Sequence, residues 1–81
     1  MVYVDDMRAP YHRMIMCHMI ADTADELHSM AQRIGVARKW YQGDHYDICL
    51  QMRKLAVMNG AKEVTRMQLG RIVIEQRKVR V

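Results

Sequence analysis

The chain runs Met14-Ile15-Met16-Cys17-His18-Met19-Ile20-Ala21 and then Asp22-Thr23-Ala24-Asp25-Glu26, an octet that is apolar except for one histidine, followed at once by polar residues. The octet alone fits a buried strand or a buried helix, because so short a run shows no decisive period. The polar stretch favours the strand, since Thr23-x-x-Glu26 has the spacing of a capping box that opens a helix. We therefore expect a strand over residues 14–21, followed by a helix.

The apolar spacing after Thr23 supports this helix. Four apolar residues recur at helical intervals: Leu27, Met30, Ala31 and Ile34. Gly35 follows at a position where glycine commonly ends a helix. His28 lies about 110° from the centre of the apolar stripe at roughly 100° per residue, which places it at the rim, where it can face a cleft.

The N-terminal residues predict a short strand and a polar loop. Val2-Tyr3-Val4 is β-branched and aromatic, and Asp5-Asp6 follows it, so the strand should present carboxylates at its C-terminal end. Arg8 and His12 flank Pro10, which is excluded from a helix interior. We expect a loop here.

Residues 36–64 predict a strand, a helix and a second short strand. The segment 36–42 contains Trp40-Tyr41, which favours a strand. Asp47 can then N-cap a helix that Asn59-Gly60 ends. Residues 61–64 form the short strand candidate.

The last segment is ambiguous. Thr65-x-x-Gln68 predicts a capped helix, whereas Gly70 interrupts it and Ile72-Val73-Ile74 would suit a strand equally. The alternation of strands with helices predicts an α/β fold. We expect one small single-domain layer structure over residues 1–81, with three to four partly parallel strands and about three helices.

Composition limits the class of protein. Eighty-one residues allow one core, and an apolar content of 51% suits a folded chain. Cys17 and Cys49 have no metal-binding spacing, so we interpret them as reduced thiols. No signal peptide and no apolar run of membrane-spanning length is present in the sequence, which predicts a cytoplasmic protein without a membrane partner. A core this small makes us expect a homo-oligomer.

The net charge of +4 comes from the C-terminal part of the chain. Residues 62–81 hold six basic and two acidic side chains, whereas residues 1–61 are neutral. The result is a basic tail at about residues 75–81. This distribution argues against a nucleic-acid surface that covers the whole protein.

The titratable side chains gather earlier in the chain. All four histidines lie within the first 45 residues: His12, His18, His28 and His45. The densest stretch is Gly43-Asp44-His45-Tyr46-Asp47. With parallel strands, Asp5, Asp22 and this stretch would lie near the ends of elements, where ligands bind in open α/β sheets. No HExxH, GxGxxG or P-loop pattern occurs in the sequence.

Each candidate also has a structural explanation. His18 fits a core imidazole bonded to backbone, Asp22 and Asp47 fit helix caps, and Tyr46 fits simple packing. His45 is harder to explain in this way, because two aspartates flank it and a turn glycine precedes it.

These residues resemble the signature of an uncharacterised bacterial and phage family, domain of unknown function number four thousand and thirty-one. The likeness covers residue 2 to about residue 65, and its most specific parts are Glu26-Leu27-His28 and His45-Tyr46-Asp47. The other matching positions are Asp5, Arg8, Pro10, His12, His18, Asp22, Gly35, Arg38, Gly43, Asp44 and Gly60-Ala61.

One branch of that family differs from this chain. Actinobacterial members carry two prolines after the first aspartate and a tryptophan near position 16. Asp6, Met7 and Met16 stand here instead, so the chain resembles the phage branch more closely. The family brings no established activity. The resemblance implies that all four histidines belong to one motif, which favours a common site.

The first functional hypothesis is a pocket that binds, and in one version hydrolyses, a phosphorylated small ligand such as a nucleotide. Arg8 and Arg38 would hold phosphate oxygens through their forked donors, beside Tyr46. The candidates for acid–base catalysis are His45, His18, His28, His12 and Asp47. Asp5, Asp22 or Asp47 would orient an imidazole or bind a divalent metal such as zinc, manganese or iron, and the cofactor stays open.

The second hypothesis is a module without catalysis. Basic residues of the C-terminal segment would contact nucleic-acid phosphates, namely Arg71, Arg77, Lys78 and Arg80. Trp40-Tyr41 would stack on bases, and the histidines would be structural. A third hypothesis is a homo-oligomeric adaptor with a methionine-rich surface.

Overall fold

Strand β3 (Met14–Ala21) is the apolar octet, and three other strands pair with it. A computed structural model describes residues 1–79. Strands β1 (Val2–Val4) and β2 (Ala9–Tyr11) pair antiparallel with the two ends of β3, and β4 (Tyr46–Cys49) pairs antiparallel with its middle. Met16 and Met19 each have partners on both sides, so β4 lies along the opposite edge of β3 from β1 and β2.

The sheet is mixed, as expected. Strand β5 (Lys62–Glu63) pairs parallel with β1, so the α/β prediction with partly parallel strands is confirmed. Within residues 1–79 the sheet has five strands, slightly more than expected, and there are three α-helices. The loop expected around Pro10 is wrong, because Pro10 lies in β2. A proline lacks the N–H that an inner strand needs, and this short outer strand tolerates it.

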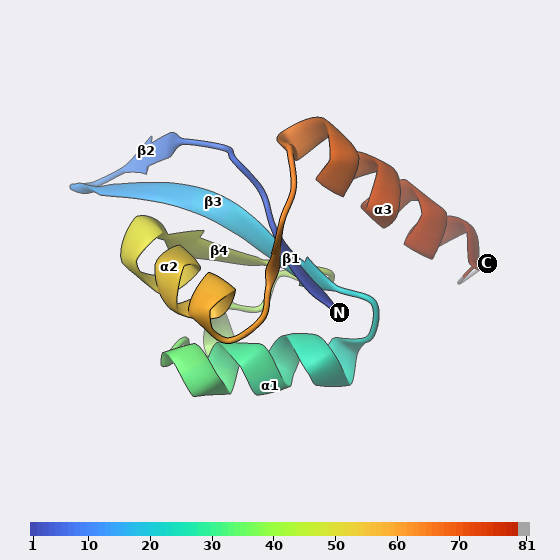
Figure 1. Cartoon of the computed structure of the whole chain (residues 1–81), viewed down its shortest axis with the longest axis horizontal. Helices are drawn as coiled ribbons and strands as arrows, with labels where there is room; N and C mark the ends of the chain where they lie inside the picture. The colour runs from blue at the N-terminus through green and yellow to red at the C-terminus, as the bar shows by residue number, and fades with distance from the viewer. Residues whose placement is uncertain (80–81) are drawn as a thin grey trace.

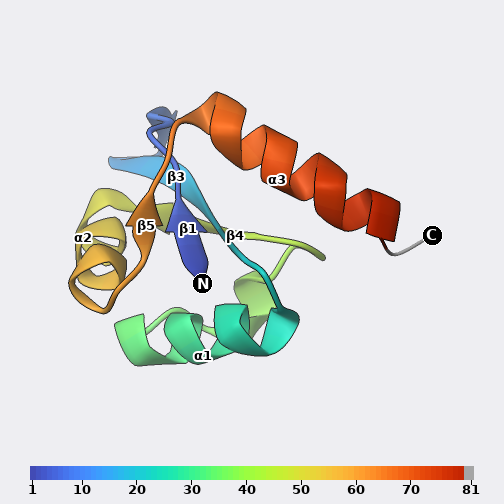
Figure 2. The same ribbon diagram turned by 45° about the vertical axis from the view of Figure 1, so that its right-hand side comes forward.

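Helices cover both faces of the sheet. Helices α1 (Ala24–Ile34) and α2 (Leu50–Met58) lie on one face, and α3 (Arg66–Val79) lies on the other (Figures 1 and 2). Met19 and Ile20 are both fully buried although they point to opposite faces of β3. The core therefore extends to both sides of the central strand.

The predicted capping boxes form at α1 and α3. At α1, Oγ1 of Thr23 accepts the backbone N–H of Glu26 at 3.2 Å, and Gly35 ends the helix with a φ of 85°. At α3, the bonds are reciprocal. The backbone N–H of Gln68 donates to Thr65 Oγ1 at 3.1 Å, and that of Thr65 donates to the Gln68 side-chain oxygen at 2.8 Å.

Two predictions between α1 and α2 are wrong. Residues 36–42 do not form a strand. They contain a 3₁₀ turn, η1 (Arg38–Trp40), and an isolated bridge from Tyr41 to Tyr46. Asp47 does not cap a helix, because it lies within β4 and α2 begins three residues later. Pairing of residues 46–49 with β3 fixes their backbone as extended, which local cap chemistry cannot outweigh.

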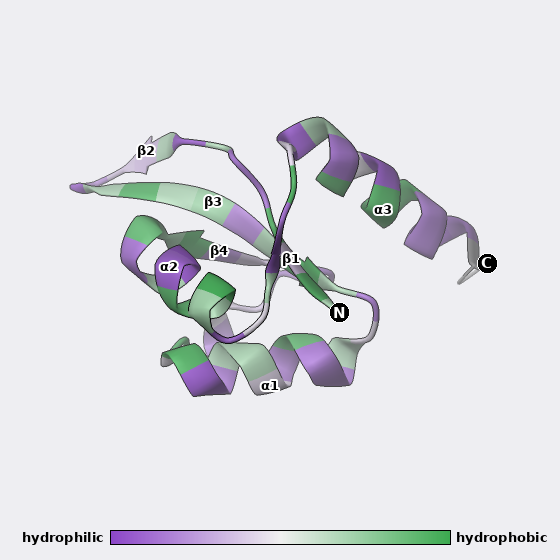
Figure 3. Ribbon diagram, viewed as in Figure 1, coloured by the Kyte–Doolittle hydropathy of each residue, from purple (hydrophilic) through white to green (hydrophobic). Residues whose placement is uncertain are grey.

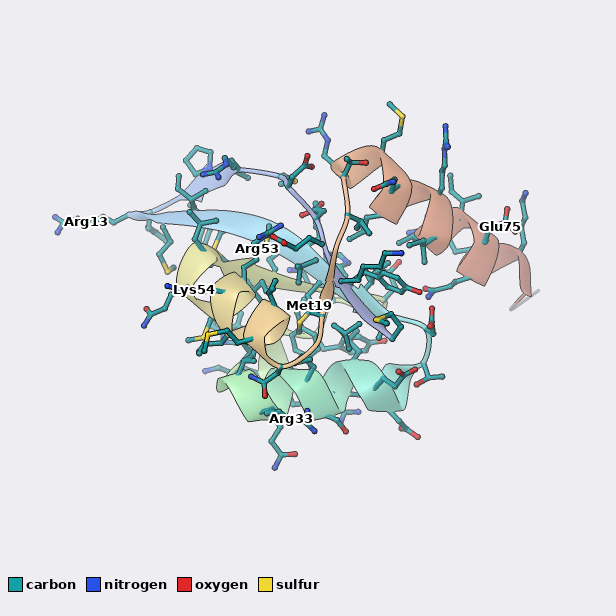
Figure 4. All side chains as sticks on the ribbon, in the orientation of Figure 1. Arg13, Met19, Arg33, Arg53, Lys54 and Glu75 are labelled. Atoms are coloured by element: carbon teal, nitrogen blue, oxygen red, sulfur yellow. The ribbon has the colours of Figure 1, made fainter. Side chains whose placement is uncertain are left out.

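Helix α3 continues through Gly70, so the strand alternative for residues 72–74 is excluded. Figure 3 shows polar and apolar bands along this helix, and Leu69 is buried. Arg53, labelled in Figure 4, links α2 to the residue after β1 and to β5. Its Nε donates to the Asp5 carbonyl at 2.9 Å, and its Nη1 donates to Glu63 at 2.8 Å. Among residues 1–79, no helix has the length and apolar character needed to span a membrane.

Candidate functional site

Asp5 is a fully buried carboxylate behind His18. It follows β1 directly, and the antiparallel pairing brings it beside the middle of β3. Its Oδ1 accepts the backbone N–H of His18 at 2.9 Å, and its Oδ2 lies 2.7 Å from the ring Nδ1 of His18. A carboxylate that accepts the Nδ1 proton leaves the Nε2 lone pair of His18 free.

Asp44 holds His45 in the same way. Its Oδ1 lies 2.6 Å from Nδ1 of His45, and its Oδ2 accepts a hydrogen bond from Arg77 at 3.1 Å. The bond from His45, followed by that from Arg77, lowers the pKa of Asp44, so this carboxyl is ionised near neutral pH. Gly43, with a φ of 88°, makes the left-handed turn that precedes the pair. Because Nδ1 of His45 donates to Asp44, the Nε2 lone pair of His45 is free as well.

Asp47 lies between the two free nitrogens. It stands directly opposite His18 in the β3–β4 register, so both side chains project from one face. Oδ1 of Asp47 is 3.8 Å from Nε2 of His18 and 3.5 Å from Nε2 of His45. Its Oδ2 accepts a hydrogen bond from Gln42 at 2.8 Å. The three potential ligand atoms lie within 4.8 Å of one another, a donor set that suits zinc, manganese or ferrous iron.

The charges of the cluster suit a divalent cation. With neutral imidazoles, Asp5, Asp44 and Asp47 carry three negative charges, and Arg77 supplies one positive charge. The side chains of His18 and His45 are 27% and 25% exposed, and that of Asp47 is 39% exposed. All three side chains are therefore partly exposed to solvent.

A cavity of about 610 Å³ opens beside the cluster. His18, Asp47 and Gln42 line part of it. Most of the remaining lining is apolar and comes from β2, the start of β3, residues 35–40 and Met52 of α2. The cluster thus has a space beside it in which a small ligand can lie.

The model of the family described as "Protein of unknown function (DUF4031)" matches residues 2–76. The chain belongs to this family. Searches of curated proteins and of solved structures gave no significant match. The resemblance drawn from the sequence is confirmed, and the match extends further toward the C-terminus than the motif residues do.

The four histidines of this DUF4031 protein do not meet in one hollow. Nδ1 of His28 lies 2.8 Å from the hydroxyl of Tyr46, whose pKa is raised chiefly by burial. Tyr46 precedes Asp47 in β4 and so points to the opposite face of the sheet, the face that α1 covers. His12 lies in the β2–β3 turn with a φ of 55°, and Arg13 beside it extends away from the molecule (Figure 4). The expected common site is therefore divided by the strand alternation.

The expected phosphate-binding arginines are also apart. Arg38 lines a hollow of about 380 Å³ with His28 and Tyr46, and Arg8 lines a separate one of about 390 Å³. Within residues 1–79, neither arginine lines the cavity beside His18. Asp22 accepts a hydrogen bond from the Tyr3 hydroxyl at 3.0 Å, away from the cluster.

The basic segment of the DUF4031 protein is partly paired with acids. Arg77 bonds to Asp44, and Lys78 bonds to Glu75 at 3.3 Å, while Arg71 lies exposed on α3. Arg80 lies outside the described residues. Nucleic-acid binding by this segment stays a prediction.

Asp44 and Gln42 have no role in either functional hypothesis drawn from the sequence, and Arg77 has one only in the nucleic-acid hypothesis. The signal for Asp44 is its position next to His45. Gln42 and Arg77 reach the cluster through the turn at Gly43 and the course of α3, which no local spacing shows.

Proposed function

We propose that this protein binds a divalent transition metal through His18, His45 and Asp47 and uses it to hold, and hydrolyse, a phosphorylated small ligand. The observation that supports this most strongly is the convergence of one potential ligand atom from each of His18, His45 and Asp47 within 4.8 Å. Nδ1 of each imidazole forms a hydrogen bond with an aspartate, as the non-ligating nitrogen of metal-binding histidines commonly does.

Three protein donors leave coordination positions for ligand and water. Phosphoryl oxygens are suitable ligands for such positions. A divalent metal held by His18, His45 and Asp47 would supply Lewis-acid activation of these oxygens and, in the hydrolytic version, of a water molecule. In this proposal Nε2 of His18 and Nε2 of His45 would bind the metal. These two histidines would then not serve as general acid or base.

The first experiment measures metal binding. The whole chain is stripped with a chelator and titrated with Zn²⁺ or Mn²⁺ by calorimetry, with elemental analysis of the product. We expect one metal per chain, with binding lost in His45→Ala and in Asp47→Ala. His12→Ala is the matched control, because His12 lies in the β2–β3 turn. Equal binding by the His45 and His12 variants would refute the proposal.

The second experiment tests hydrolysis. p-Nitrophenyl phosphate is incubated with stripped and metal-loaded protein, and release of the phenolate is followed by absorbance. We expect release only by the loaded protein, and none by Asp47→Ala. Metal binding without release would leave ligand binding as the function and exclude hydrolysis of this ester.

A further inference from the structure

We infer that the ligand of this protein has a single phosphoryl group and an uncharged, aromatic body that lies in the cavity beside the cluster. The inference rests on the proposed metal site and adds the chemical class of what binds there. It follows from the lining of the 610 Å³ cavity, from its charge and from its size.

The lining separates into a polar patch and an apolar wall. The polar side chains His18, Gln42 and Asp47 lie close together, since Gln42 bonds to Asp47 and Asp47 faces His18. The wall is made of thioethers and rings, namely Met7, Met14, Met16, Pro10, Tyr11 and Trp40. A ligand that fills the cavity would place its polar group at the patch and an apolar body against the wall.

Charge limits the ligand to one anionic group. In the described part of the chain, no lysine or arginine lines the cavity. The ammonium of Lys39 lies 5.3 Å from the ring centroid of Trp40 but is not part of the lining. A polyphosphate needs several cationic partners for its oxygens. The metal would coordinate the oxygens of one phosphoryl group, and a second phosphate would meet no cationic side chain among the described residues of the lining.

The volume of the cavity and the exposure of its aromatic side chains favour a ligand with an aromatic body. The volume of about 610 Å³ lies within the range of roughly 300–1,000 Å³ that is typical of small-molecule sites, far beyond what one phosphate fills. Trp40 and Tyr11 are 57% and 56% exposed, so both rings have surface to bury against a ligand. Methionine side chains adapt to flat rings and make favourable sulfur contacts with them.

The test compares benzylphosphonate with methylphosphonate and pyrophosphate on the metal-loaded whole chain. Calorimetry should give benzylphosphonate an affinity about tenfold or more above that of methylphosphonate, because burying a ring is favourable. Pyrophosphate should bind more weakly than benzylphosphonate. Trp40 is the only tryptophan of the sequence, so its fluorescence should shift with benzylphosphonate and much less with methylphosphonate.

Two variants test whether the ring of benzylphosphonate lies against Trp40. Trp40→Ala should abolish the preference for benzylphosphonate in calorimetry and leave the metal content unchanged. Met58→Ala is the control, because Met58 is 72% exposed on α2 and lies outside the lining. It should retain the full preference.

The outcomes separate this inference from the proposed function. Metal content is measured first on the same samples, and absence of metal binding overturns the proposed function and this inference together. Loaded protein that binds both phosphonates equally, binds neither, or prefers pyrophosphate overturns the inference alone. A Trp40→Ala variant that keeps the wild-type preference also overturns it.

Discussion

Oδ2 of Asp5 lies 2.7 Å from Nδ1 of His18, and Oδ1 of the same carboxylate accepts the backbone N–H of His18. One buried side chain therefore fixes both the strand and the ring of this histidine. The contact depends on the antiparallel pairing of β1 with β3. The orientation of the ring is thus set by folding, before any ligand arrives.

Asp5→Asn should weaken both metal binding and the fold. If the amide oxygen of Asn still accepts the hydrogen bond from the backbone N–H of His18, the amide nitrogen faces Nδ1 of the ring. It then donates to Nδ1, so the proton of the neutral imidazole lies on Nε2. We expect metal affinity to fall about 10–100-fold. The free energy of unfolding should fall by about 1–3 kcal/mol. Zinc calorimetry and urea unfolding measure the two effects. Unchanged zinc affinity would show that Nε2 of His18 is not a ligand.

Tyr46→Phe should leave metal binding unchanged. The substitution removes the hydroxyl that bonds to His28, on the face opposite His18. We expect the free energy of unfolding to fall by about 1 kcal/mol, as for the loss of one hydrogen bond. Urea unfolding and zinc calorimetry on the same preparation check this. A loss of zinc binding would mean that the two faces of the sheet work as one site.

The strand β3 and the helix α1 could be predicted because their local signals agree. An apolar octet, a capping box at Thr23 and a glycine at residue 35 all indicate the same structure. Residues 36–49 could not be predicted in this way. Their local signals indicate a strand and then a capped helix, whereas pairing of β4 with β3 decides the outcome. That pairing joins residues about thirty positions apart, so no short window contains it.

The candidate site was predictable to a similar extent. His45 and Asp47 are two positions apart in the densest polar stretch of the sequence, and both lie in the cluster with His18. The separation of His28 and Tyr46 from it follows from the strand period, since adjacent residues of β4 point to opposite faces. The pairing of Asp5 with His18 depends on the β1–β3 register, which no local sequence pattern predicts.

Stability should decline in acid partly because of Asp44. Its pKa in the folded chain is lowered from 3.8 by His45 and Arg77. A lowered folded-state pKa adds stability above the unfolded value, and this stability is lost as the pH falls through the folded pKa. The free energy of unfolding should therefore fall below about pH 4. Urea unfolding from acid to neutral pH should show a smaller fall in Asp44→Asn than in the parent. An identical acid dependence would contradict the assignment.

Two glycine substitutions should act in opposite directions. Gly35 has a φ of 85°, so Gly35→Ala should destabilise the protein by about 1–2 kcal/mol. Gly70 lies inside α3, and among the described residues an added Cβ there meets no atom within 4 Å apart from its chain neighbours and the nearby backbone of its own helix. Gly70→Ala should therefore stabilise it by about 0.5–1 kcal/mol. Thermal unfolding measures both, and the same sign for the two variants would contradict the backbone argument.

The two cysteines should react at very different rates. Burial, followed by the charge of Asp5, raises the pKa of Cys17 to about 12, and its surface is 1% exposed. Cys49 is half-buried and lines the cavity beside Asp47. A thiol must ionise to attack a disulfide reagent, so one thiol per folded chain should react promptly near pH 8 and the other only after unfolding. Cys49→Ser should remove the prompt reaction. Prompt labelling that survives in this variant would show that Cys17 is reached in the folded protein, so the β3–β4 pair opens readily.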